Sequence, residues 1–333
     1  MKIIASYMMF ICLVISCEKQ TETPTETPKI NLSIDDKNYV VNNSLPKGDV
    51  RRYGVFPNKP VNQNNLGNII RLAAKGVPIT FPKGVYETNL VFNKISNINI
   101  VFQDAVFSGG INILNGSHTF KFDGNVTILD KLFIRKSSNI IFDNVTLMSD
   151  TLRNIYHKEN RGVSIYVGSK NIEFNTLKIT DTGGNSDRFY TYSAAALQIH
   201  GWNNNPQNIT INTLEITNSA RTALYVTGKD HKFKKVTITN FGIGSTKNMF
   251  GLEDAKPKEE TEFTGLWMNK CDNCEVDSLS IDNTKLGATY SLRLGEGVYH
   301  EPSFIYNINF KNKAIGMTIK DDILTNILVK NEY

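Results

Sequence analysis

From about residue 96 onward, short segments that alternate apolar and polar residues recur along the chain. They read NIEFNTLKIT, NITINTLEIT, KFKKVTIT, CEVDSLSID and FIYNINFKN, and an Asn or Asp lies near most of them. Alternation with a period of two is typical of half-buried strands, and Asn and Asp are common turn residues. Because no amphipathic segment of helical length separates the strands, the pattern predicts an all-β chain rather than alternating strands and helices.

A second short strand is predicted after most of these segments. These second strands cover residues 163–167, 196–200, 223–227, 265–269, 291–294 and 316–320. They recur at intervals of about 25 to 42 residues, which is typical of the rungs of a solenoid whose loops differ in length. The long segments 151–161, 183–193, 242–264 and 284–290 precede second strands, so we expect them at one corner, as a wall beside a cleft.

The segment before the repeats resembles the entry motif of the pectate-lyase-like right-handed parallel β-helix superfamily. The matching pieces are Tyr53-Gly54-Val55, the helix-like segment Leu66–Lys75 and the strand-like segment ITFPKGVY at 79–86. The resemblance implies a right-handed parallel β-helix with a short N-terminal capping helix, whose apolar side Ile69, Ile70, Leu72 and Ala73 would supply. It does not specify the chemistry, because one fold carries many activities.

The N-terminal residues predict export. Residues 1–16 contain Lys2 followed by a mostly apolar run, as in a signal peptide, and LVISC at 13–17 resembles the lipobox of bacterial lipoproteins. That resemblance implies lipidation of Cys17 and anchoring to the outer membrane, at the cell surface or its periplasmic face; an ordinary signal peptide is the alternative. Residues 17–29 read as a Thr/Glu/Pro tether. We expect one β-helix catalytic domain over residues 30–333, with residues 30–95 as its cap and first rung.

Strand alternation also predicts which side chains leave the solenoid. If Ile165, Leu197, Leu224, Leu266 and Leu292 point inward, their neighbours form two outward columns on one wall. The first column would be Tyr166, Gln198, Tyr225, Trp267, Arg293 and Thr318, and the second Gly168, His200, Thr227, Asn269, Gly295 and Lys320. Three aromatic side chains beside Arg, His, Gln and Asn are unusual on a solvated wall and suit the stacking of sugar rings. Decoration between rungs is the alternative interpretation.

Charge and carboxylate placement narrow the chemistry. The net charge of +5 and pI near 8.8 suit an anionic ligand but are too small and too evenly spread to indicate nucleic acid. Hydrolysis of a glycoside normally needs two carboxyl groups, and neither column contains one. The nearby carboxylates lie in flanking segments, at Asp187, Glu253, Asp254, Glu262 and Glu296. The polygalacturonase pattern is also missing, so hydrolysis is disfavoured and stays an alternative.

β-Elimination on a uronic acid fits the columns better. It needs a cation near the C5 carboxylate, a base for the C5 proton and an acid for the oxygen that leaves C4. We assign Arg293 as the cation, because its planar fork fits a carboxylate, and His200 and Tyr225 as the proton-transfer pair. Substrate-binding candidates are Tyr166, Gln198, Arg221, Trp267, Asn269, Tyr190, Tyr192 and Glu296; Tyr190 and Tyr192 are also rival proton donors.

The predicted substrate is a uronate-containing polysaccharide or oligosaccharide of the algal cell-wall type, with or without sulfate esters. The enzyme either cleaves the chain or dehydrates a terminal uronate. An epimerase and a non-catalytic surface glycan-binding protein remain alternatives. Calcium serves many lyases of the resembled superfamily, but the columns lack the stacked carboxylates that it prefers, so we predict no cofactor. Cys271 and Cys274 cannot complete a zinc site alone; a disulfide and a pair of thiols both stay open.

Overall fold

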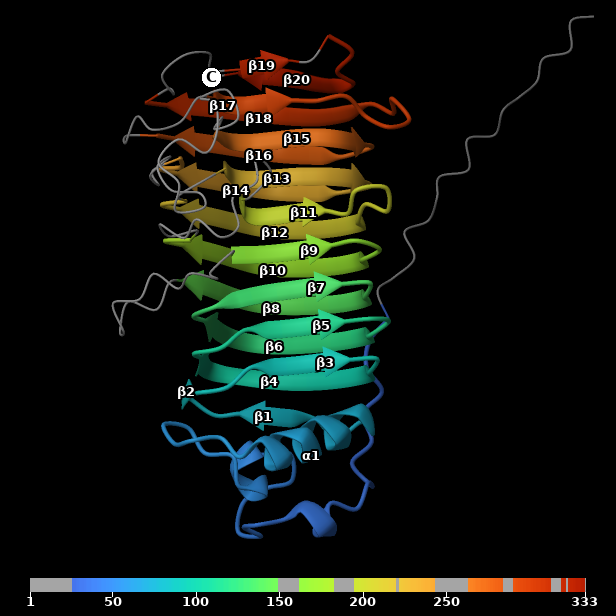
Figure 1. Ribbon diagram of the computed structural model, residues 1–333, viewed down its shortest axis with the longest axis vertical. Coiled ribbons are helices and arrows are strands. Elements are labelled where there is room, and N and C mark those ends of the chain that lie inside the picture. The colour runs from blue at the N-terminus through green and yellow to red at the C-terminus, as the bar shows by residue number, and fades with distance from the viewer. Residues whose placement is uncertain are drawn as a thin grey trace, which may run out of the picture.

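The computed structural model of the chain describes residues 26–148, 162–182, 195–219, 222–242, 263–283, 290–312, 319–321 and 323–332. Within these ranges twenty strands form one continuous sheet that winds along the long axis (Figure 1). The strands are β1 (Ile79–Phe81), β2 (Gly84–Tyr86), β3 (Leu90–Asn93), β4 (Ser96–Phe107), β5 (Ile111–Leu114), β6 (His118–Ile128), β7 (Lys131–Arg135), β8 (Ser138–Met148), β9 (Gly162–Tyr166), β10 (Lys170–Thr180), β11 (Ala195–His200), β12 (Gln207–Thr217), β13 (Thr222–Lys229), β14 (Lys232–Thr239), β15 (Thr264–Asp272), β16 (Glu275–Asp282), β17 (Tyr290–Leu294), β18 (Ser303–Lys311), β19 (Ile319–Asp321) and β20 (Ile327–Glu332).

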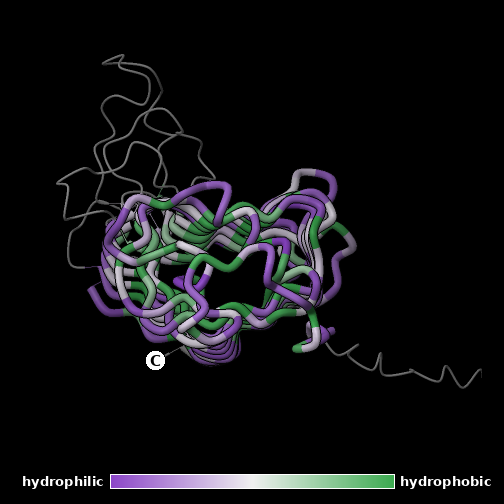
Figure 2. The backbone as a smooth tube through the Cα atoms, turned by 90° about the horizontal axis from the view of Figure 1, so that it is seen from below, coloured by the Kyte–Doolittle hydropathy of each residue, from purple (hydrophilic) through white to green (hydrophobic). Residues whose placement is uncertain are grey.

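From β3 onward, each strand pairs in parallel with the strand two places further along the chain. The odd-numbered strands from β3 to β19 therefore form one stack, and the even-numbered strands from β4 to β20 form another. One odd and one even strand make up each rung, and the rungs lie over one another when seen along the axis (Figure 2). The predicted all-β parallel β-helix is confirmed.

The even strands are long because most of them turn a corner of the solenoid. In β10, Ile172 and Phe174 point inward, and so do Leu177 and Ile179. The inward step between Phe174 and Leu177 is three residues instead of two, so the strand changes its phase near Asn175, which is exposed. A single even strand therefore covers two walls of the rung, which the alternation pattern alone would have counted as one wall.

The interior of the solenoid is filled by stacked apolar side chains. The rings of Phe122 and Phe142 lie 4.7 Å apart, and those of Phe142 and Phe174 lie 4.7 Å apart with nearly parallel planes. These residues occupy matching positions of β6, β8 and β10. Because the rung spacing of about 4.8 Å is close to the distance between stacked rings, identical residues on successive rungs pack without voids.

Asparagine ladders hold the turns of the solenoid in register. Asn139, Asn171 and Asn208 occupy one position on three rungs, the second residue of β8, β10 and β12 next to the turn, all with φ between 52° and 56°. The amide of Asn171 donates to Asn139 at 2.9 Å, and that of Asn208 donates to Asn171 at 3.0 Å. Asn tolerates the left-handed conformation better than most residues, and its amide both donates and accepts. This explains the Asn and Asp that mark the turns in the sequence.

The predicted capping helix is present as α1 (Gln63–Ala74) and lies against β4 at the N-terminal end of the solenoid (Figure 1). The Asn62 side chain caps it by accepting from the backbone N–H groups of Asn64 and Asn65. Its buried residues are Leu66, Ile69, Leu72 and Ala73, while Ile70 is partly buried. Two short 3₁₀ helices, η1 (Lys37–Tyr39) and η2 (Val50–Tyr53), precede it. The helix thus covers apolar residues that the first rung would otherwise expose.

Candidate functional site

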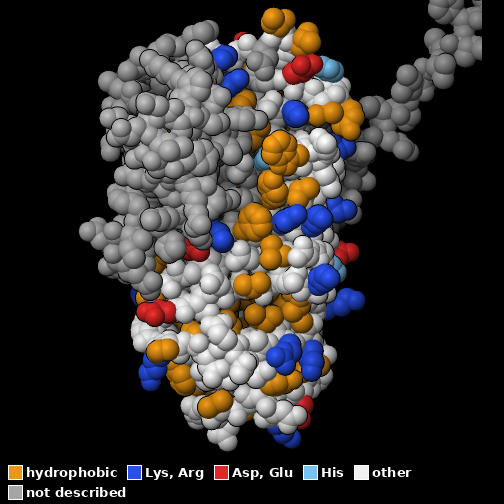
Figure 3. All heavy atoms as spheres, viewed as in Figure 1, with side chains coloured by type: hydrophobic (Ala, Val, Ile, Leu, Met, Phe, Trp, Pro, Cys, Tyr) orange, Lys and Arg blue, Asp and Glu red, His pale blue; other side chains and the backbone are white. Residues whose placement is uncertain are grey.

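The odd-numbered strands carry two outward columns of side chains on one wall. In the first column, Gln198 of β11 pairs with Tyr225 of β13, which pairs with Trp267 of β15 and then Arg293 of β17. In the second column, Tyr166 of β9 pairs with His200 of β11. The predicted adjacency of Tyr225, Trp267 and Arg293 is therefore confirmed. Figure 3 shows apolar side chains gathered in a strip along the molecule, with lysine and arginine beside it.

Two register assignments from the sequence are wrong. Tyr166 lies in the second column beside His200, and Ser164 takes the predicted place of Tyr166 beside Gln198. Lys320 lies in the first column beside Arg293, in place of Thr318, which is outside the described residues. Both errors are shifts of two residues. Because side chains alternate with a period of two, such a shift preserves the inward and outward faces and changes only the partner on the next rung.

Ring contacts connect the two columns into a ladder. The ring of Tyr166 lies 5.9 Å from that of His200, which lies 5.5 Å from that of Tyr225. The ring of Tyr225 in turn lies 4.8 Å from that of Trp267, and the Arg293 guanidinium lies 4.1 Å from the centre of the Trp267 ring. We call these five side chains the ladder. Its spacing falls in the range of favourable aromatic and cation–π contacts.

The exposure predicted for the ladder is wrong for two of its members. Tyr225 is 3% exposed and Trp267 is 6% exposed. They pack with Ala195 in an apolar cluster separate from the solenoid core. Tyr166, His200 and Arg293 are half-buried. The rings shield one another because neighbouring rungs place them at contact distance, which the assignment of outward faces could not reveal. The accessible parts of the ladder are therefore its two ends, Tyr166 with His200 at one end and Arg293 at the other.

His200 is held as a neutral imidazole. Burial lowers its pKa, and the positive charge of Lys270 lowers it further. Its Nδ1 atom is buried and makes no hydrogen bond within the described part of the chain. A half-buried imidazole that is unprotonated near pH 7 can accept a proton from a carbon acid.

The Tyr225 hydroxyl is oriented from the next rung. The side-chain amide of Asn269 donates a hydrogen bond to the Tyr225 hydroxyl oxygen at 3.1 Å. This contact fixes the position of the phenol oxygen relative to the rung of β15. Asn269 lies where the sequence places it, one rung above Tyr225, and acts on the hydroxyl that the sequence assigns to proton transfer.

The other described candidates lie around this pair. Gln198 is half-buried beside Tyr225 in the first column. Glu296 follows β17, and its carboxylate lies 3.5 Å from the imidazole of His300 on the same exposed turn. Glu296 therefore lies at a corner rather than on the wall that carries the ladder.

Several predicted residues lie outside the described residues. These are Cys17, Tyr190, Tyr192 and Arg221, the carboxylates Asp187, Glu253, Asp254 and Glu262, and most of the segments expected to form the wall of a cleft. Their proposed roles stay predictions.

Both cysteines of the CxxC motif are buried free thiols; Cys271 lies near the end of β15 and Cys274 in the turn that follows. The Cys271 thiol donates to the carbonyl of Val226, and the Cys274 thiol donates to that of Asp272, each at 3.4 Å. Burial raises the pKa of the Cys271 thiol, so it is held protonated and unreactive. Within the described ranges no three His, Cys, Asp or Glu side chains converge as metal ligands would; these residues do not form a calcium site, and the expectation of no cofactor stays a prediction.

The sequence analysis missed two residues next to the ladder. Trp202, in the turn after β11, is 65% exposed; its ring lies 5.2 Å from that of His200, and its indole N–H donates to the Tyr166 hydroxyl at 2.8 Å. Lys270, at the end of β15, is exposed and acts on the pKa of His200. Trp202 lies in a turn, and Lys270 lies in β15 at a register shift, so strand alternation predicts the face of neither residue. The signal for Trp202 was an aromatic residue in the Asn-rich turn GWNNNP.

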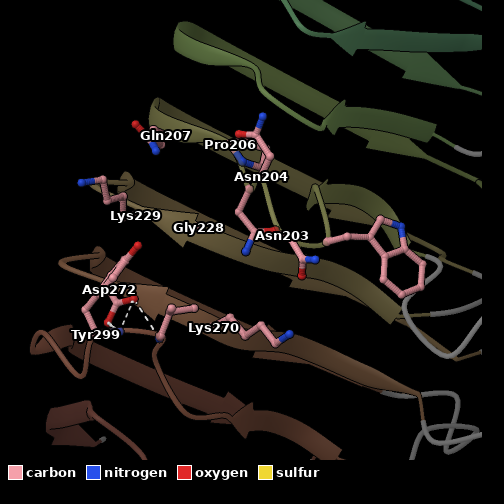
Figure 4. Close-up of a pocket in the computed structure, with 12 residues that line it drawn as sticks. Asn203, Asn204, Pro206, Gln207, Gly228, Lys229, Lys270, Asp272 and Tyr299 are labelled. Atoms are coloured by element: carbon pink, nitrogen blue, oxygen red, sulfur yellow. Dashed lines mark hydrogen bonds between the residues drawn. The ribbon is translucent and has the colours of Figure 1, made fainter.

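These two residues also line a pocket at the corner where the odd strands end. It has a volume of about 340 Å³ and lies between the 202–207 turn and the ends of β13 and β15, with Val298 and Tyr299 on its far side. Figure 4 shows Lys229, Lys270 and Asn203 around it. The carboxylate of Asp272 also faces it and accepts the backbone N–H groups of Val298, Tyr299 and Glu301 at 2.9 to 3.1 Å.

No protein-family model, curated protein or solved structure matches the chain. The superfamily resemblance therefore rests on the sequence motifs. No helix among the described residues is long and apolar enough to cross a membrane.

Proposed function

We propose that this protein is a carbon–oxygen lyase that performs β-elimination on uronic acid residues of an acidic polysaccharide or its oligosaccharides. The observation that carries the proposal is the contact between His200 and Tyr225. A neutral imidazole lies 5.5 Å, ring to ring, from a phenol whose hydroxyl Asn269 orients. One group is suited to accept a proton and the other to donate one, as elimination requires.

In the proposed reaction, His200 removes the proton from C5 of the uronate. The electron pair of that C–H bond forms the C4–C5 double bond, the bond from C4 to its oxygen breaks, and Tyr225 gives its proton to the leaving oxygen. Lys270, whose charge acts on the pKa of His200, stabilises the negative charge that develops on the carboxylate. Arg293 lies on β17, three rungs from His200 on β11, so it would bind the carboxylate of a neighbouring sugar unit. The Arg293 guanidinium lies over the face of the Trp267 ring, 4.1 Å from the ring centre, and this contact positions it. A sugar at C4 makes the reaction chain cleavage, and a free hydroxyl makes it dehydration.

Lys270 supplies a cation near His200, since its charge lowers the pKa of that imidazole. It lies on β15 with Trp267, one rung before Arg293 on β17. Two cations also explain why an acidic sugar is favoured over a neutral one. We further propose that the chain is an exported lipoprotein anchored through Cys17; Cys17→Ser should then move it from the membrane fraction to the soluble fraction.

A non-catalytic glycan-binding protein is the second candidate, and the exposed ring of Trp202 favours it. One assay separates the two. The protein is incubated with a panel of uronate polysaccharides and oligosaccharides while the ultraviolet absorbance of unsaturated uronate is followed. Absorbance with shorter chains means cleavage, and absorbance with unchanged chain length means dehydration. Reducing ends without absorbance would mean hydrolysis, and binding without either signal would mean that the protein only binds glycans.

A further inference from the structure

Trp202 has a backbone conformation that is unusual for its residue type. Its φ is +58°, in the left-handed region, where bulky residues are rarely found and cost about 1 to 3 kcal/mol. The turns after β9, β13 and β15 contain Gly168, Asp230 and Asn273, also with positive φ. A turn that other rungs make with smaller or flexible polar residues thus carries one of the two tryptophans of the chain.

Contacts with two neighbouring side chains fix the position of the indole. Its N–H is bonded to the Tyr166 hydroxyl and its ring contacts the imidazole of His200, yet 65% of the side chain is exposed. Burial therefore does not account for a tryptophan here. A rigid, exposed aromatic face that borders a pocket is the usual platform for a flat apolar surface such as the C–H face of a sugar ring.

The side chains that line the pocket carry a net charge of +1, from Lys229 and Lys270 against Asp272. Lys229 and Lys270 line it, and Lys229 is 41% exposed, with its nearest carboxylate, that of Asp230, 4.0 Å away. The carboxylate inside the pocket, Asp272, accepts three backbone N–H groups, so those donors already stabilise its charge. The volume of about 340 Å³ lies at the lower end of the usual range for ligand pockets, about 300 to 1,000 Å³.

We infer that this corner pocket binds one anionic sugar residue, carrying a carboxylate or a sulfate ester, with its ring on Trp202 and its charge near Lys229 and Lys270. Because Trp202 contacts His200, the pocket would hold the unit next to the one that reacts. The inference deepens the proposed function and rests on it for the identity of the neighbouring unit. Binding itself does not depend on turnover, so the two can be tested apart.

Acrylamide quenching of tryptophan fluorescence tests the pocket in the intact protein. Trp202 is exposed and Trp267 is 6% exposed, so the quenchable signal reports Trp202. The probes are alginate and galacturonate tetramers for carboxylate, a carrageenan tetramer for sulfate, an ulvan oligosaccharide for both, and maltotetraose as the neutral sugar. We expect at least one acidic probe to protect Trp202 and to bind more weakly as salt is raised. Protection by none of them, or equal protection by maltotetraose, would overturn the inference.

Matched variants connect binding to the residues. Lys229→Met should weaken binding of the protecting probe about two- to five-fold, as measured by calorimetry. Lys121→Met is the control, since the Lys121 side chain is 40% exposed and lies 3.0 Å from the carboxylate of Asp123 on β6. Equal affinity of the two variants for the probe would show that Lys229 does not contribute to binding. If acidic probes bind but no unsaturated uronate forms, the proposed elimination activity is wrong, while the proposed binding of an anionic sugar in the pocket is supported.

Trp202→Asn removes the indole in a variant that is expected to fold. Asn adopts the left-handed conformation more readily than Trp, so this variant should fold with an unchanged or higher melting temperature. It should bind the probe more than about ten-fold more weakly. Unchanged affinity in a folded Trp202→Asn protein would refute the role of the indole.

Discussion

The ring of His200 lies 5.5 Å from the ring of Tyr225, although the residue that pairs with Tyr225 across the two strands is Gln198. The contact is diagonal and joins the two outward columns. It brings a neutral imidazole and an oriented phenol together on adjacent rungs of a rigid sheet. Sites built on strands hold such geometry more tightly than sites on loops, so the proposed chemistry makes sharp predictions for these two side chains and their neighbours.

The first prediction concerns the pH dependence of turnover. A base must be unprotonated, and burial together with Lys270 lowers the pKa of His200 below its usual 6.5. The midpoint of the acidic limb of the activity should therefore lie below pH 6.5. Lys270→Gln removes one of the two causes, so it should raise the pKa of His200 and move the acidic limb of the kcat/KM profile to higher pH. An acidic limb that stays in place in Lys270→Gln, as it should in Lys121→Gln, would argue against His200 as the base.

Tyr225→Phe removes the proposed acid while keeping the ring that packs between His200 and Trp267. We expect kcat to fall by about 10² to 10⁴, the usual contribution of general acid catalysis, with a much smaller change in the affinity for a saturated oligouronate. The far-ultraviolet circular dichroism should be unchanged because the ring contacts remain. Tyr306→Phe, on β18, is the control and should retain full activity. A Tyr225→Phe enzyme with normal kcat would transfer the acid role to another group, such as Tyr190 or Tyr192.

The sequence predicted the fold well because alternation and turn chemistry repeat on every rung. The inward positions of β11, β13, β15 and β17 and the asparagine-rich turns all follow from it. The rung partner of Tyr166 did not follow, because a shift of two residues leaves every face assignment intact. Nor did the burial of Trp267, which depends on contacts with neighbouring rungs. The role of Trp202 was not predicted, because the side-chain position of an isolated turn residue does not follow from the alternation pattern.

His231 should make the stability depend on pH. The side chain is fully buried at the turn after β13; its Nδ1 accepts from the backbone N–H of Ile209 and its Nε2–H donates to the carbonyl of Thr227. Burial lowers its pKa to about 4. Above pH 6.5 the imidazole is neutral in both the folded and the unfolded chain. Between pH 6.5 and 4 only the unfolded chain takes up the proton, so the free energy of unfolding should fall by about 3 kcal/mol from this group.

Urea unfolding at several pH values checks this expectation. His231→Gln keeps a donor and an acceptor but does not titrate, so its unfolding free energy should lose less between pH 6.5 and 4 than that of the unmodified protein. His118→Gln, at an exposed position on β6, should retain the original dependence. Parallel pH curves for all three proteins would show that His231 does not control acid stability.

The last prediction assigns a structural role to Asp272, the buried carboxylate at the corner pocket. Its two oxygens accept the backbone N–H groups of Val298, Tyr299 and Glu301. Gly297 lies so close that a Cβ there would come within 2.4 Å of the carboxylate. Asp272→Ala leaves these donors without their acceptor, so the unfolding free energy should fall by about 1 to 3 kcal/mol. Hydrogen exchange at residues 298–301 should accelerate first, because the loss is local. Asp277→Ala, an exposed substitution on β16, is the control; if it destabilises the protein as much as Asp272→Ala does, the carboxylate does not anchor the segment.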